Sequence, residues 1–538
     1  MRTPLTLWNT LGKVDTEVRP SQPDGVLRMY HCGPTVYATP HLGNLRRFLV
    51  ADLLVRTLRY LGYELRSIMN ITDVGHLLEP TPPSPASSFG LRGPGVEDNV
   101  AGLAPRSLPS TMSSGSNGGE VGQDRMVVAA QREGMSPEEI AAKYTEEFFT
   151  ALTALHALPA DHYPRATMNI PWMIQLTERL LKNGRAYETP SGVYFDVTKA
   201  PTYGRLSGNT LAALEAGARV DIREEKRHPA DFALWIKAAK EHLMQWDSPW
   251  GRGYPGWHIE CSAMATHALG ETIDIHTGGE DNIFPHHENE IAQSEGATGK
   301  PFATIWLHNA HLLLDDKKMS KSEGTFITLK DILDRGVDPL AFRLLVLQTH
   351  YRSKLNFSWE SLDAAAEALQ SLRSFVQGVW RTGERKISTE NVSAESPSWD
   401  FDQREQEFTD AVANDLGSPQ ALAVVFNTVR AFNPAVSDDT LAVSTARRIL
   451  DQFRHFDRIL ALIDVDAARG SETIPGEVLR LSQAREAARG KEDFAAADRL
   501  REEIRRAGFE VEDTPHGPRV IPRESPRPGG GLRPRREP

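Results

Sequence analysis

Cysteine is scarce in this chain, with two residues, Cys32 and Cys261, among 538. Two cysteines cannot build the disulfide framework of a small secreted domain, so we expect a reducing, cytoplasmic location. The chain also lacks a run of about 18 apolar residues, the length that a membrane-spanning helix requires. Its first residues, Met1 to Trp8, lack the apolar segment of a signal peptide. We therefore expect no membrane partner.

A surplus of basic residues is absent as well. The formal net charge is −11, from 61 Lys and Arg against 72 Asp and Glu, which argues against sequence-independent coating of nucleic acid. Positive charge is concentrated at residues 519–538, which contain six arginines and two glutamates. A chain of 538 residues exceeds a single hydrophobic core, so three or four domains are expected.

The N-terminal region has a strand–helix–strand pattern. Residues 27–32 read as a strand that stops at Gly33, and residues 63–71 read as a second strand. Between them lies a helix whose apolar residues recur at helical spacing and which Gly62 ends. This βαβ unit predicts an α/β fold in which ligands bind at the carboxyl ends of parallel strands.

The composition changes sharply elsewhere along the chain. Residues 79–119 are rich in Pro, Ser and Gly, which predicts a disordered insertion to which we assign no function. Residues 358–464 have an almost continuous helical pattern, and residues 494–507 read as a helix before a short strand. The basic segment after residue 522 is predicted to be a disordered tail.

Both cysteines belong to a set of residues that suits a metal ion. His286 and Glu290 are four residues apart on an expected helix that Pro285 begins, so both side chains lie on one face. Together with Cys32 and Cys261 they supply two thiolates, an imidazole and a carboxylate, which are zinc ligands. Four protein ligands are typical of a closed, structural zinc site, so the residues alone favour that interpretation.

Two further segments suit a nucleotide. The loop from Lys318 to Ser322 carries two lysines and two serines, which can neutralise a triphosphate as pyrophosphate departs. The segment from His41 to Asn44 lies between the first strand and a helix whose N-terminus suits a phosphate. Taken singly, a lysine cluster is usually a solvated loop, and a lone histidine at a turn is usually a structural hydrogen-bonding residue.

These segments resemble known signature motifs. His41-Leu-Gly-Asn44 and Lys318-Met-Ser-Lys-Ser322 resemble the two signatures of class I aminoacyl-tRNA synthetases. Four other segments resemble the cysteinyl-tRNA synthetase family, and the similarity covers nearly the whole chain: Cys32–Tyr37, Asn70–Asp73, Gly256–Met264 and Phe284–Ser294. The resemblance implies activation of cysteine by ATP to cysteinyl-adenylate, followed by transfer to the 3′-terminal adenosine of tRNA(Cys).

The resemblance also implies a role for individual residues. The zinc ligands are Cys32, Cys261, His286 and Glu290, with the substrate thiolate as an added ligand. The residues implied for the substrate cysteine are Cys32, Thr72 and Trp257. Those implied for ATP, accompanied by Mg²⁺, are His41, Asn44, Gly279, Asp281 and Lys321, and the implied catalytic residues are His41, Asn44, Lys318 and Lys321. Asn44 departs from the class signature, which has a second histidine there. Because metal–sulfur bonding excludes serine, no editing domain is expected.

The resemblance and the changes in composition predict a division into domains and a monomeric protein. The expected fold class is α/β, with a Rossmann-type parallel-sheet catalytic domain, a connective insertion, a helical tRNA-binding bundle and a small mixed C-terminal domain. The expected boundaries are 20–170 and 255–277 for the catalytic domain, 171–254 for the connective peptide, 278–357 for the stem-contact region with the lysine loop, 358–465 for the anticodon-binding helices, 466–522 for the C-terminal domain and 523–538 for the tail.

Three alternatives stay open at the level of sequence. A cysteine ligase of mycothiol synthesis resembles the same family and shares its zinc and loops, but it acts on an amino-sugar and has no need of the regions after about residue 358. A non-catalytic tRNA-binding relative would tolerate loss of the signature residues, which are intact here. A structural zinc protein without activity would not need the paired loops.

Overall fold

The computed structural model describes most of the chain. The described residues are 3–74, 125–217, 225–239, 242–314, 317–318, 326–384, 399–466, 468, 476–490, 493–514 and 517–522. The predicted insertion at 79–119, the predicted tail at 523–538 and Lys321 lie outside them. Among the helices described, none combines the length and the apolar character needed to cross a membrane.

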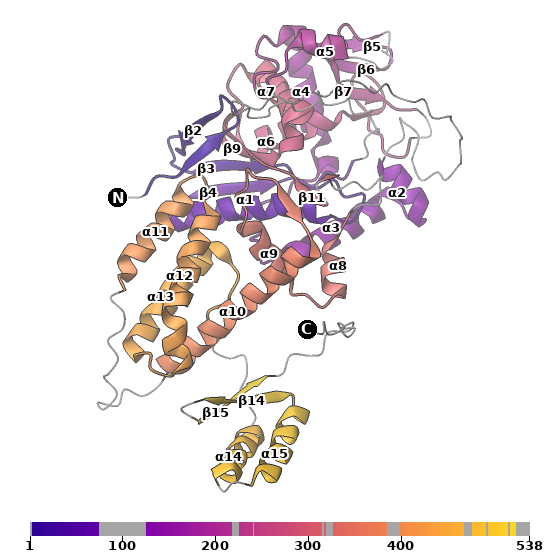
Figure 1. Cartoon of the computed structure of the whole chain (residues 1–538). Helices are drawn as coiled ribbons and strands as arrows, with labels where there is room; N and C mark the ends of the chain where they lie inside the picture. Colours follow the sequence, from indigo (N-terminus) through magenta and orange to yellow (C-terminus); the bar gives the residue numbers. More distant parts are fainter. Residues whose placement is uncertain are drawn as a thin grey trace, which may run out of the picture.

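A four-stranded parallel sheet lies at the centre of the region predicted to be catalytic (Figure 1). Its strands, in spatial order, are β10 (Ala303–Asn309), β9 (Ile273–Gly279), β3 (Leu27–His31) and β4 (Leu65–Met69). Successive residues face opposite sides: Met29 belongs to the cluster of α1 (Leu42–Tyr60), and Tyr30 to that of α6 (Trp257–Leu269) and α7 (Glu288–Thr298). Because helices cover both faces, the strands are mostly apolar. The predicted α/β fold class is confirmed.

Helix α1 begins and ends where the sequence pattern indicates. His41 is the N-cap and forms a reciprocal capping box with Asn44, which satisfies free N–H groups at the helix start. The helix stops at Tyr60, and Gly62 follows with a φ of +80°, a conformation that glycine adopts without steric cost. The start of α1 therefore lies at the carboxyl edge of the sheet, beside the end of β3.

The sheet extends beyond the predicted catalytic boundaries. Strand β10 lies outside both 20–170 and 255–277, so the predicted end at 277 is too early. The chain before residue 20 also belongs here, since Trp306 donates its backbone N–H to Asn9 Oδ1 at 2.9 Å. These contacts join segments almost 300 residues apart, and local sequence patterns carry no information about such pairings.

The connective region has a sheet of its own. Its four antiparallel strands pack against α4 (Ile170–Lys182), and Leu176, Phe195 and Trp235 are buried in the same cluster as α6. The strands, in order, are β5 (Ala186–Thr189), β6 (Gly192–Phe195), β7 (Phe232–Lys237) and β8 (Gly253–Pro255). The other elements before α6 are β1 (Thr6–Asn9), β2 (Val14–Glu17), α2 (Arg125–Glu133), α3 (Pro137–Ala154) and α5 (Leu211–Gly217).

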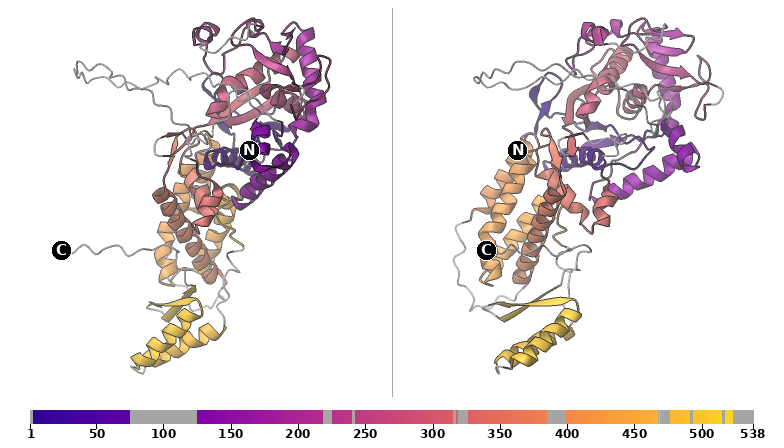
Figure 2. Two further views of the ribbon diagram at one scale, coloured as in Figure 1. Left: turned by 90° about the vertical axis from the view of Figure 1, so that its right-hand side faces the viewer. Right: turned by 45° about the vertical axis from the view of Figure 1, so that its right-hand side comes forward.

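Long helices dominate the region after residue 358. Figure 2 shows α10, α12 and α13 lying side by side along the length of the bundle. The elements between the sheet and this bundle are β11 (Leu312–Leu314), β12 (Lys317–Lys318), α8 (Leu329–Asp334), α9 (Pro339–Leu347) and β13 (Leu355–Phe357). The bundle helices are α10 (Trp359–Gly383), α11 (Phe401–Ala413), α12 (Ser418–Ser437) and α13 (Val443–Leu460).

The last described unit has a separate small core. It consists of α14 (Gly476–Gly490), α15 (Phe494–Arg506) and the antiparallel hairpin of β14 (Phe509–Thr514) and β15 (Gly517–Pro522). Its buried residues, Val478, Ile504, Val511 and Val520, form a cluster distinct from the other cores. The predicted helix and strand near residues 494–511 are present, and α14 is an element that we did not predict.

A buried ion pair joins the bundle to the sheet region. Arg343 on α9 donates to Asp52 Oδ2 on α1 at 2.6 Å, and both residues are at most 4% exposed. The same guanidinium donates to the carbonyl oxygens of Leu460, at the end of α13, and Leu155, just after α3. One side chain thus fixes four elements relative to one another.

We predict that Asp52→Asn destabilises the protein by about 3–5 kcal/mol, because it leaves the Arg343 charge buried without its partner. Thermal unfolding followed by circular dichroism should show a clearly lower Tm. Asp334→Asn, which removes the exposed Lys330–Asp334 pair, is the control and should leave Tm unchanged. Equal Tm values for the two variants would contradict the role given to the buried pair.

Candidate active site

Four predicted zinc ligands converge at one buried point. The donor atoms of Cys32, Cys261, His286 and Glu290 all lie within 4.8 Å of one another, and all four residues are buried. Cys32 directly follows β3, and its backbone N–H donates to the Thr277 carbonyl of β9 at 3.2 Å. Cys261 projects from α6, His286 lies in the turn just before α7, and Glu290 lies in the first turn of α7. Segments more than 200 residues apart thus supply a single donor set.

The distances suit a tetrahedral zinc ion. Zinc–sulfur bonds of about 2.3 Å place two tetrahedral ligands about 3.8 Å apart. The sulfurs of Cys32 and Cys261 are 3.9 Å apart, and Cys32 Sγ lies 3.7 Å from Glu290 Oε1. His286 Nε2 lies 3.0 Å from the same oxygen, a hydrogen-bonding separation slightly shorter than a tetrahedral edge. The residues fit the ion with small adjustments.

The helix that carries His286 and Glu290 begins less regularly than predicted. Phe284 has an extended backbone, with φ of −138° and ψ of 134°, and the helical conformation follows from Pro285. The segment Ile283–His287 is therefore kinked at Phe284, and the regular α7 follows it. The i, i+4 pair nevertheless meets, because both residues lie after the kink.

The ionisable groups of this cluster differ in protonation state. Burial raises the pKa of the Cys32 thiol, and the contact with Cys32 together with burial raises the pKa of the Cys261 thiol well above its ordinary value. Burial acts to raise the pKa of Glu290, but the imidazoles of His276 and His286 outweigh it and lower the pKa. The carboxylate is therefore anionic, whereas the thiols retain their protons until a metal binds and displaces them.

Two histidines that sequence reasoning missed belong to a second group of metal donors, which shares two residues with the first. Cys32 and Glu290 also lie with His276 and His287 in a group that could hold a metal. His276 Nε2 lies 2.9 Å from Glu290 Oε2, the oxygen that faces away from His286. Such a contact orients a ligating carboxylate. Zinc prefers the set with two thiolates, so we assign His276 to the outer shell of the site.

The residues predicted to surround the substrate flank the cluster. Thr72 is 3% exposed and hydrogen-bonds to Asn70, whose amide oxygen is 3.8 Å from Cys261 Sγ. Trp257 is 40% exposed, and its ring centroid lies 4.7 Å from that of His286. The metal cluster is therefore bordered by a buried hydroxyl and by an aromatic ring that solvent can reach.

The described segment that follows the lysine loop lies next to the first signature. Leu42 donates its backbone N–H to the Ile327 carbonyl at 2.8 Å, and His41 pairs with Thr328. The segment just after the lysine loop therefore runs against the start of α1. His41 Nδ1 accepts the N–H of Asn44 at 3.3 Å, so this helix N–H is already satisfied by the protein. Lys318 pairs with Leu313 through the backbone, and Lys321 lies outside the described residues.

The predicted adenosine residues follow β9. Gly279 ends this strand, and a Cβ there would lie 2.4 Å from Asp281 Oδ1, so the Asp281 carboxylate packs directly against this glycine. Arg47, which we did not predict, donates to Asn282 Oδ1 at 3.3 Å and to the Gly33 carbonyl at 3.1 Å. It connects the adenosine-side turn to the residue next to Cys32. Its position on α1 gave no signal, because arginine is common on helices.

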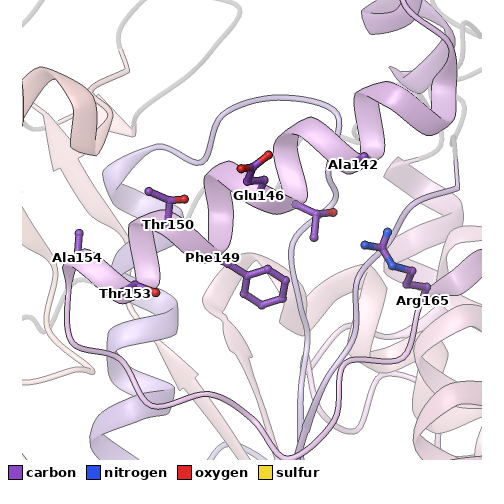
Figure 3. A pocket seen from close by; sticks show the side chains of 8 residues that line it. Ala142, Glu146, Phe149, Thr150, Thr153, Ala154 and Arg165 are labelled. Atoms are coloured by element: carbon purple, nitrogen blue, oxygen red, sulfur yellow. The ribbon is translucent and has the colours of Figure 1, made fainter.

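A hollow of about 740 Å³ lies elsewhere, along α3. Figure 3 shows Phe149 and Glu146 projecting from α3 in different directions and Arg165 on a neighbouring segment beside the helix. None of the predicted site residues lines it. Its lining has one carboxylate and one guanidinium and lacks a set of metal donors, so it is separate from the candidate active site.

Comparison with known proteins agrees with this geometry. Residues 18–78 and 119–367 match the class I (C) tRNA synthetase catalytic domain, 407–464 the DALR domain, and 472–518 the cysteinyl-tRNA ligase anticodon binding domain. A cysteine–tRNA ligase of Thermus thermophilus is 40% identical over 521 residues, covering 96% of this chain and 98% of that protein. The chain belongs to the cysteine–tRNA ligase family.

Further relatives support this assignment. The cysteine–tRNA ligase of Chlorobaculum tepidum is 37% identical over 529 residues, covering 95% of this chain and 98% of that protein. Methionyl-tRNA synthetase of Mycobacterium tuberculosis, solved with methionyl-adenylate, has a TM-score of 0.55 at 13% identity, covering 88% of this chain and 96% of that chain, which shows a shared fold. The match to the catalytic domain skips residues 79–118, where we predicted an insertion.

We predict that Cys261→Ser abolishes stoichiometric zinc binding, because an alcohol stays protonated and is a poor ligand. His276→Gln should keep the ion but bind it about 10–100-fold more weakly, since it removes an outer contact. Elemental analysis after dialysis against graded chelator measures both effects. Full zinc in Cys261→Ser, with loss in His287→Gln, would instead assign the ion to the second donor set.

Proposed function

We propose that the protein is a cysteine–tRNA ligase. It activates cysteine with ATP to give cysteinyl-adenylate and pyrophosphate, and then transfers the cysteinyl group to the 3′-terminal adenosine of tRNA(Cys). The observation that carries the proposal is the convergence of Cys32, Cys261, His286 and Glu290 beside Thr72, in a chain of this family.

Zinc is the cofactor that we propose for the cluster. When bound, it supplies a Lewis acid that accepts the thiolate of cysteine and discriminates against the protonated hydroxyl of serine. Cys32, Cys261, His286 and Glu290 would hold it, and His276 would orient the carboxylate. Pocket shape alone distinguishes such similar amino acids poorly, so this selection removes the need for editing.

The phosphate side of the reaction is proposed for the adjacent loops. His41 and Asn44 would contact the ATP phosphates, while Lys318 and Lys321 would neutralise the departing pyrophosphate, with Mg²⁺ bound to the nucleotide. Gly279 and Asp281 would border the adenosine. The contact of Leu42 with Ile327 supports this proposal, because it holds the segment after the lysine loop against the start of α1.

A tRNA acceptor is favoured over an amino-sugar by the regions beyond the sheet. The helices α10 to α13 and the unit of α14 to β15 provide surfaces that a small acceptor would not require. The match of residues 472–518 to the cysteinyl-tRNA ligase anticodon binding domain supports the same choice. We further propose that the protein acts as a monomer in the cytoplasm, where the two free thiols stay reduced.

We predict that the zinc-loaded protein catalyses ATP–pyrophosphate exchange that depends on cysteine, whereas serine supports exchange at least about 10³-fold less efficiently, as expected when a site binds one functional group specifically. Radiolabelled pyrophosphate incorporation measures both amino acids under the same conditions. Charging assays with tRNA and with an amino-sugar acceptor then separate the two ligases. Absence of exchange in protein with one zinc per chain would refute the proposed activity.

We predict that a chain ending at Asp466 keeps exchange activity but charges tRNA at least tenfold less efficiently. The small core of Val478, Ile504, Val511 and Val520 is separate from the catalytic cores, so its removal should spare adenylate formation. This end point retains Val465, whose carbonyl accepts the Trp380 indole N–H. Measuring kcat/KM for tRNA in both chains gives the test, and equal charging would show that the C-terminal unit does not contribute.

A further inference from the structure

A chain of hydrogen bonds with a fixed direction lies beside the metal cluster. The backbone N–H of Gly33 donates to Asn70 Oδ1 at 2.7 Å. This contact fixes the amide, so Asn70 Nδ2 faces Thr72 Oγ1 and donates to it at 3.0 Å. The Thr72 hydroxyl then donates to Glu260 Oε2 at 3.1 Å. The direction of every step follows from a backbone N–H, which can only donate.

This direction determines what Thr72 can offer a ligand. Its single hydroxyl proton is used by Glu260, and one of its two lone pairs is used by Asn70. The remaining lone pair can accept a hydrogen bond but cannot donate one. Behind it lies the side chain of Glu260, a residue that is 0% exposed. A hydrogen-bond acceptor supported by a buried carboxylate favours a donor with positive charge.

The same residues are tied to the metal ligands. Asn70 Oδ1 lies 3.8 Å from Cys261 Sγ, and Glu260 immediately precedes Cys261 on α6. The chain of hydrogen bonds therefore meets Cys261 twice: Asn70 contacts its sulfur, and Glu260 precedes it on α6. A thiol bound at the cluster would place next to Thr72 the group that two carbon atoms separate from its sulfur. In cysteine and in cysteamine this group is an ammonium.

We propose that Glu260 is a positioning residue that acts through Thr72 to make the site select thiols carrying an ammonium group. This inference rests on the proposed function and names a residue through which its site would select the amino group of the substrate. Thiols that bind metal equally well but lack the amine would gain nothing from the Thr72 lone pair. The network thus adds a second criterion to metal–sulfur bonding.

Binding of three thiols to the zinc-loaded full chain tests the proposal by calorimetry. Glu260→Gln should weaken L-cysteine and cysteamine by about tenfold or more, because a charge-assisted contact is lost. The affinity for 3-mercaptopropionate, which lacks the amine, should stay within about twofold. Thr72→Val, which removes the hydroxyl at similar volume, should also weaken L-cysteine and cysteamine relative to 3-mercaptopropionate. Zinc content measured in each variant shows that the cluster is intact.

Glu288→Gln provides a matched control on α7. This buried carboxylate accepts the backbone N–H groups of Leu206 and Ser207, in the connective region, so the ratio between amine and des-amino thiols should not change. Equal losses for all three thiols in Glu260→Gln, or no loss for any, would overturn the inference. If the zinc-loaded wild-type chain binds none of them, the proposed function itself fails.

Discussion

The parallel pairing of β3 with β9 is the constraint on which the site depends. The backbone contact from Cys32 to Thr277 prolongs this pairing by one residue beyond β3 and turns the thiol toward α6. Because side chains alternate along a strand, a slip of one residue would move this thiol to the α1 face, among the apolar residues around Met29. The proposed zinc ligands Cys261, His286 and Glu290 would then lack their fourth partner. Strand register therefore determines the proposed metal site as well as the fold.

The buried cluster is costly for folding and is retained by mutual contacts. Ionisable groups without solvent need partners, and here each imidazole has one: His276 with Glu290, and His287 with His308 at 2.7 Å. Such a network contributes little stability compared with apolar packing of equal volume. Its presence at the carboxyl edge of the sheet, where ligands bind in parallel α/β folds, therefore points to chemistry rather than to stability.

Sequence reasoning identified the groups whose signal is local. Cys32 after a strand and the i, i+4 pair of His286 and Glu290 could be recognised because neighbouring residues define their geometry. The orienting role of His276 could not be predicted, since it depends on the approach of β9 to α7. The same holds for β10, whose membership of the sheet is decided by pairing with a strand that a helix separates from it. What sequence reasoning missed is nonlocal in each case.

Gly33 connects the residues proposed for cysteine with those proposed for the nucleotide. Its N–H orients Asn70, which contacts Thr72, while its carbonyl accepts Arg47, which also donates to Asn282 in the turn after Gly279. One peptide segment therefore links the two proposed subsites. A Cβ at this position would lie 1.5 Å from the Asn70 carbonyl oxygen, so any larger residue must separate the ends of β3 and β4. Such a separation would displace Thr72 from the cluster around Cys32 and Arg47 from Asn282 at once, because both are anchored to the same backbone.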